Sequence, residues 1–113
     1  MSESDPIGLA RNEIIKALQS RQSGNEGRAR VCARRAAGYL VKGYLEKNGI
    51  KDPGSSAIIR LRLLLSQPGL SPDVKQTAGY FIIHVNPNHE LPIDVDLIDA
   101  ARRLADLLLG IQL

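Results

Sequence analysis

The strongest structural signal in the chain is the sequence NEGRARVCARRAAGYLVKGYLEKNG, residues 25–49. Asn25 offers a side-chain acceptor to the first free amides of a helix. Asn48 and Gly49 form the pair expected where a left-handed residue ends one. At 100° per residue, one face of this helix gathers small and apolar side chains, namely Ala29, Ala33, Ala36, Ala37, Leu40 and Tyr44. We therefore predict a long central helix that its neighbours can approach closely.

Four more segments have apolar residues at helical spacing. They cover residues 6–20, 56–66, 72–85 and 96–110, with candidate N-caps at Asp5, Ser55 or Ser56, Ser71, and Asp94 or Asp96. Two prolines and two asparagines in residues 86–92, NPNHELP, predict a loop. No segment has a convincing strand period. The prediction is an all-α fold, a four-helix up-and-down bundle with a short additional helix.

Length and composition are those of an ordinary globular domain. The chain has 113 residues, of which 43% are apolar and 24% charged, so we expect one domain over residues 1–113. Cys32 is the single cysteine, which excludes an internal disulfide. The start, MSESDPIG, lacks the basic and apolar regions of a signal peptide. No apolar run approaches the roughly 18 residues of a membrane span. A cytoplasmic protein without membrane contact is expected.

The positive charge is concentrated in the first half of the chain. Residues 1–51 hold ten Lys and Arg against five Asp and Glu, whereas residues 52–113 hold five against seven. In the central helix, Arg28, Arg35 and Lys42 recur at intervals of seven opposite the alanine face, and Arg30 and Arg34 form a strip along one flank. Such cations can hold phosphate through charge-assisted hydrogen bonds, although each could equally be solvated surface. They are the candidate ligand-binding residues.

The predicted helix over residues 56–66 is more apolar than one core contact requires. Its sequence AIIRLRLLL is interrupted only by Arg60 and Arg62. Two explanations stay open: a subunit interface, which would make the protein a homodimer, or a short helix buried between two neighbours.

Few residues have the character of a catalytic or metal site. The chain contains no GxxxxGK[ST], GxGxxG, CxxC or HExxH motif. His84 and His89 flank Asn86, but neither their spacing nor a third strong ligand is diagnostic of a metal site. Cys32, among alanines and arginines, is best explained as a packed small side chain. We expect no metal and no cofactor.

Three segments in this order resemble the HEPN domain (higher eukaryotes and prokaryotes nucleotide-binding), a family of small helical domains. RRAAGYLVKGYLEKNG, residues 34–49, is similar to that family's pattern of paired alanines, a lysine, an aliphatic end and a glycine. LSPDVKQTAGYFIIHVNPNH, residues 70–89, and DLIDAARRLADLLL, residues 96–109, resemble its later helices. The resemblance implies binding of a nucleotide or RNA.

Two departures from the family pattern bear on activity. Family members that cut RNA have an arginine, a polar residue and then a histidine, and no such arginine precedes His84 or His89 at the required spacing. Gly38 stands where many relatives have a glutamate. Because the chain lacks that arginine and histidine pair, the resemblance favours a non-catalytic protein.

Three functions follow as hypotheses. The first is a non-catalytic HEPN-like module that binds a nucleotide, RNA or a partner protein through the basic surface of the central helix. The second is a divergent, metal-independent ribonuclease that uses His84, Asn86 and His89. The third is a structural partner in a toxin–antitoxin or nucleotidyltransferase pair.

Overall fold

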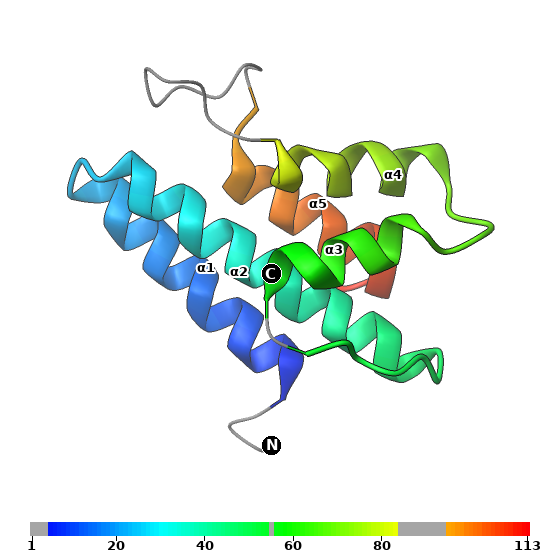
Figure 1. Ribbon diagram of the computed structural model, residues 1–113. Helices are drawn as coiled ribbons and strands as arrows, with labels where there is room; N and C mark the ends of the chain where they lie inside the picture. Colours follow the sequence, from blue (N-terminus) through cyan, green and yellow to red (C-terminus); the bar gives the residue numbers. More distant parts are fainter. Residues whose placement is uncertain (1–4, 55, 84–94) are drawn as a thin grey trace.

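The computed structural model describes residues 5–54, 56–83 and 95–113. These residues form five α-helices and a short 3₁₀ turn (Figure 1), with no β-strand among them. The elements are α1 (Pro6–Gln22), α2 (Glu26–Lys47), α3 (Ala57–Leu65), α4 (Pro72–Gly79), η1 (Tyr80–Ile82) and α5 (Leu97–Leu109). The all-α prediction is confirmed for the described part of the chain.

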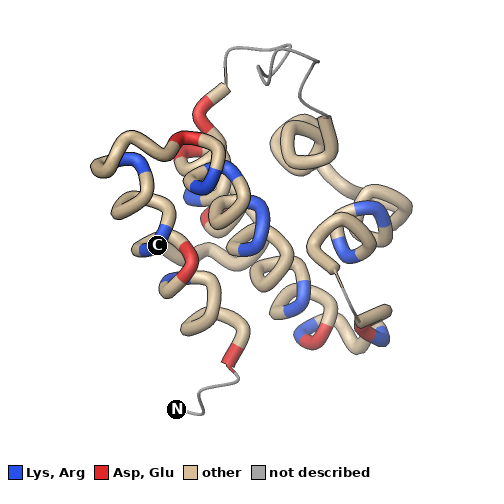
Figure 2. Tube along the Cα trace, turned by 60° about the vertical axis from the view of Figure 1, so that its left-hand side comes forward, with Lys and Arg blue, Asp and Glu red and all other residues tan. Residues whose placement is uncertain are grey.

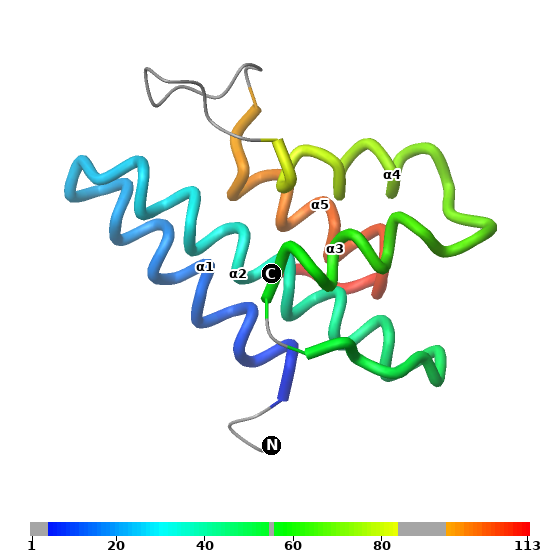
Figure 3. Tube along the Cα trace, in the orientation of Figure 1, coloured from blue at the N-terminus to red at the C-terminus, as the bar shows by residue number. Residues whose placement is uncertain are grey.

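The helices α1 and α2 form an antiparallel hairpin (Figure 3). Small side chains line the contact: Ala10 and Ala17 of α1 are fully buried, as are Ala29, Ala33, Ala36 and Ala37 of α2. Alanine keeps the helix axes close and gives up little side-chain entropy on burial. The predicted alanine face is therefore the centre of the core.

The helix α5 packs on α2 and is itself covered by α4 and η1. Its inner face buries Ile98, Ala101, Leu104 and Ala105, while Asp99, Arg103 and Asp106 face solvent. Phe81 of η1 is fully buried in the same core. For most of its residues, the predicted C-terminal helix thus buries the face that the sequence pattern predicts to be buried.

Local capping groups explain where most helices begin. The Asn25 side chain accepts from the Arg28 amide at 3.0 Å, and Ser71 accepts from Val74 at 3.2 Å. Asp5 is an exception, because its carboxylate makes no cap hydrogen bond. There α1 starts on Pro6, whose ring fixes the backbone in a helical conformation and whose missing amide needs no acceptor.

The helix α3 crosses α2 at Gly38. A Cβ atom at Gly38 would lie 2.6 Å from the Cβ and 2.8 Å from the Cα of Ala57, the first residue of α3. The close approach therefore requires glycine, and a glutamate at this position would collide with α3.

The segment predicted as one helix over residues 72–85 is shorter than expected. The α-helix ends at Gly79, η1 follows, and Ile83 is extended. Gly79 stabilises a helix poorly, and the tighter 3₁₀ turn places Phe81 in the core. The prediction of a helix through Ile83 was wrong, and Val85 lies outside the described residues.

The apolar surplus of α3 is largely covered by the chain itself. Leu61 and Leu64 are fully buried, and α3 packs against α2, α4 and η1. Ile59 is the large apolar residue of α3 that stays exposed, at 45%. The other large apolar residues of α3 are partly exposed, and the homodimer stays a prediction. In the part of the chain that the structure describes, no helix has the length and apolar character to cross a membrane.

Candidate anion-binding site

A cavity of about 350 Å³ lies between α2 and α3. Both arginines and apolar side chains line it, and we call it the α2–α3 cavity. Its lining consists of Val31, Arg34, Arg35, Tyr39, Ser56, Ala57, Ile58 and Arg60. Three arginines in one concave site favour an anionic ligand.

Arg34 is half-buried and is held in place by a backbone group. Its Nε donates to the carbonyl oxygen of Phe81 at 2.8 Å. Burial lowers the pKa of Arg34, and the nearby charge of Arg30 lowers it further. Among the residues described, no carboxylate forms an ion pair with Arg34. The guanidinium is therefore partly desolvated and has no counter-charge among the described residues, an arrangement that a bound anion would relieve.

Arg35 and Arg60 complete the basic lining in different ways. Arg35 is exposed and has no ion pair within the described ranges. Arg60 donates to both carboxylate oxygens of Asp52, at 2.9 and 3.0 Å. This bond lowers the pKa of Asp52, so the carboxylate stays charged at neutral pH. The guanidinium of Arg60 also lies 6.0 Å from the ring centroid of Tyr39.

The N-terminus of α3 forms part of the cavity wall. Ser56 caps the helix by accepting from the Ile59 amide at 3.3 Å, and Ser56, Ala57 and Ile58 all line the cavity. A helix N-terminus carries partial positive charge, which adds to that of the arginines.

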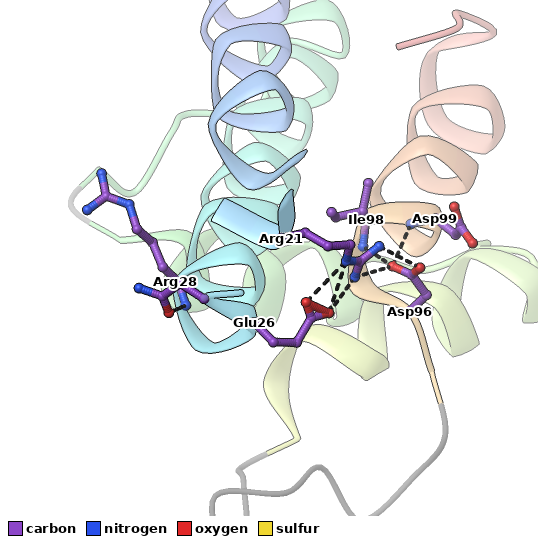
Figure 4. Close-up of polar contacts among 7 residues, drawn as sticks. Arg21, Glu26, Arg28, Asp96, Ile98 and Asp99 are labelled. Carbon is purple, nitrogen blue, oxygen red and sulfur yellow. Dashed lines mark hydrogen bonds and ion pairs between the residues drawn. The ribbon is translucent and has the colours of Figure 1, made fainter. Parts of the chain in front are cut away.

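The predicted basic residues do not act as one group. Arg34 and Arg35 line the cavity, whereas Arg28, Arg30 and Lys42 do not. Arg28 lies near the α1–α2 turn, where its side chain points away from its neighbours (Figure 4). Figure 2 shows how widely the Lys and Arg positions are spread along the chain. Of the predicted ligand-binding residues, Arg34 and Arg35 are therefore the ones that line this cavity.

The three candidate catalytic residues, His84, Asn86 and His89, lie outside the described residues. Where the chain is described, no three His, Cys, Asp or Glu residues gather as a metal site.

Cys32 is fully buried, as its predicted packing role requires. Burial raises the pKa of its thiol, and the nearby Glu13 raises it further. Glu13 is itself buried; its Oε1 lies 3.6 Å from the Nζ of Lys16, and its Oε2 has no hydrogen-bond partner among the described residues. A protonated buried thiol is a poor nucleophile, so Cys32 is a core residue.

A second polar cluster joins the α1–α2 turn to the start of α5 (Figure 4). Arg21 donates to both oxygens of Glu26 and to both oxygens of Asp96, at distances between 2.6 and 3.1 Å. Asp96 also caps α5 by accepting from the amides of Ile98 and Asp99. Because the Arg21 guanidinium and both carboxylates find their partners within the protein, this cluster is structural.

Three polar residues of the cavity were not predicted from sequence: Tyr39, Ser56 as a lining residue, and Arg60. Arg60 had one visible signal, since it interrupts an otherwise apolar segment. Comparison of the chain with family models, curated proteins and solved structures finds no match.

Proposed function

We propose that this chain is a non-catalytic helical binding module that holds a phosphate-bearing ligand, a nucleotide or RNA, in the α2–α3 cavity. One observation carries the proposal: Arg34 and Arg35 line the same cavity, and neither is neutralised by a carboxylate of the described residues. The HEPN resemblance supports the same ligand class. The proposal also includes the four-helix up-and-down bundle that the resemblance implies.

The two arginines would hold the phosphate in complementary ways. The Nε of Arg34 is occupied by the Phe81 carbonyl, which fixes the side chain and leaves its terminal amino groups for a ligand. Arg35 reaches the same space from solvent. Guanidinium groups bind phosphate through paired, charge-assisted hydrogen bonds, and a fixed side chain loses less entropy on binding.

Titration of the purified chain with a nucleoside monophosphate and with a labelled oligoribonucleotide tests the proposal. Arg34→Gln and Arg35→Gln should each weaken binding about tenfold or more, since a hydrogen bond to a charged group contributes about 1.5–3 kcal/mol. Arg28→Gln is the matched control, because Arg28 lies outside the cavity and should change affinity little.

The thermal midpoint of each variant separates lost binding from lost folding, and Arg35→Gln should leave it unchanged. Binding that Arg34→Gln and Arg35→Gln do not weaken would refute the proposal. Equal losses in Arg28→Gln would place binding on the whole surface of α2 instead. If neither probe binds, the result would favour the structural-partner hypothesis.

A further inference from the structure

The charges around the α2–α3 cavity do not cancel. Three arginines line it, and one of them, Arg60, is paired with Asp52 at 2.9 and 3.0 Å. The pair is well enclosed, with side chains only 13% and 21% exposed. Among the described residues, Arg34 and Arg35 therefore leave two positive charges that the protein does not neutralise.

The partial burial of Arg34 bears on which ligand charge fits best, whereas Arg35 is exposed to solvent. A singly charged anion would leave one guanidinium without a counter-charge, and Arg34 is half-buried beside Arg30. Partly desolvated charges interact more strongly than charges in water and are more costly when unpaired. A compact group with two negative charges would balance the site.

The apolar and aromatic lining residues of the cavity indicate what the charged group is attached to. Besides the arginines, the lining includes Val31, which is 42% exposed, and Ala57, Ile58 and Tyr39. The volume of about 350 Å³ is at the lower end of small-molecule sites and exceeds what one phosphate group fills. A small apolar or aromatic body fits the remaining space.

We infer that the α2–α3 cavity selects a doubly charged phosphate monoester on a small apolar or aromatic group over a phosphodiester. The inference rests on the proposed function and narrows its ligand class. A phosphodiester carries one negative charge, whereas a phosphate monoester carries about 1.5 to 2 at pH 7, because its second pKa is near 6. The internal phosphates of RNA are diesters, so a free terminal phosphate is the preferred group.

Isothermal titration with phenyl phosphate and with its diester, methyl phenyl phosphate, tests this selectivity. At pH 7.5 the monoester should bind about tenfold tighter or more, since it makes an additional charged contact. The preference should decline as the pH falls through about 6, where the monoester loses its second charge. The Arg60 hydrogen bonds lower the pKa of Asp52, so this carboxylate stays charged over this range and the change with pH comes from the ligand.

The variant Arg35→Gln provides the second readout. Removing one of the two unneutralised charges should reduce the preference for monoester over diester to nearly none, while Arg28→Gln should retain it. If monoester and diester bind equally and both depend on Arg34 and Arg35, the selectivity is refuted and the proposed function stands. If neither compound binds and the probes of the preceding section also fail, both are refuted.

Discussion

The close approach of Gly38 and Ala57 makes a direct test of the packing of α3 on α2. In Gly38→Ala, the new Cβ would lie 2.6 Å from the Cβ and 2.8 Å from the Cα of Ala57. The Cα belongs to the backbone of α3, so no side-chain rotation relieves the collision. The N-terminal turn of α3 must move outward, and with it one wall of the α2–α3 cavity.

The size of the effect follows from two opposing contributions. Overpacking a core costs about 1–3 kcal/mol, and collision with backbone places this case in the upper half of the range. Replacing glycine by alanine inside a helix returns up to about 1 kcal/mol. The net loss should be about 1–2 kcal/mol, or about 4–8 °C in the thermal midpoint of a domain of this size.

Gly43→Ala is the matched control within the same helix. There a Cβ would meet Ile7 and Pro6 at 3.6 Å, an ordinary van der Waals distance, so the variant should gain about 0.5–1 kcal/mol. Urea unfolding followed by circular dichroism measures both variants. Adding Ala57→Gly to Gly38→Ala should recover part of the loss, because it removes the collision with the side chain of residue 57 and leaves the collision with its backbone. Equal stability of the two alanine variants would contradict the close approach.

Three further predictions concern polar groups. Hydrogen bonds from Arg60 lower the pKa of Asp52 below its usual 3.8, so this carboxylate adds stability that is fully present above about pH 4 and is lost as the pH falls through the lowered value. Asp52→Asn should therefore flatten the decline of the urea midpoint in acid, and parallel pH profiles for variant and parent would argue against this role. Glu13→Met should raise the free energy of unfolding by up to about 1 kcal/mol, since it removes the buried Oε2 that has no partner among the described residues, while the lost ion pair with the exposed Lys16 contributes little; a clear loss in urea unfolding would mean that the contacts of the carboxylate outweigh its burial cost. Arg21→Gln should cost about 1 kcal/mol and speed amide exchange in the first turn of α5, because Arg21 bridges two carboxylates. Arg11→Gln, at an exposed position, is the control, and the same change in exchange for both variants would show that the bridge does not matter.

The helices were predictable because their signals are local. The alanine face of α2, the cap at Asn25 and the Ser71 start each depend on residues within a few positions of one another, and the structure confirms them. The predictions failed where contacts between residues that are distant in sequence determine the structure. The end of α4 at Gly79 follows from the burial of Phe81, which sequence periodicity does not show.

Only some of the residues that line the α2–α3 cavity could be predicted from the sequence, for a geometric reason. Arg28, Arg35 and Lys42 share a helix face by periodicity, but seven residues advance a helix by about 10.5 Å. The neighbouring helix α3 covers only a part of that length, and so one of the three lines the cavity. Arg60 joins it from α3, and no spacing within α2 could have indicated this.

The hydrogen bond from Arg34 to the Phe81 carbonyl spans 47 positions of sequence. It ties Arg34, which lines the cavity, to η1, an element that does not itself line the cavity. If the proposed anion site exists, a partner that displaced η1 would release this arginine and weaken anion binding from a distance, and by linkage the anion would oppose that displacement equally. The domain thus has the means for two surfaces to influence each other through a single side chain.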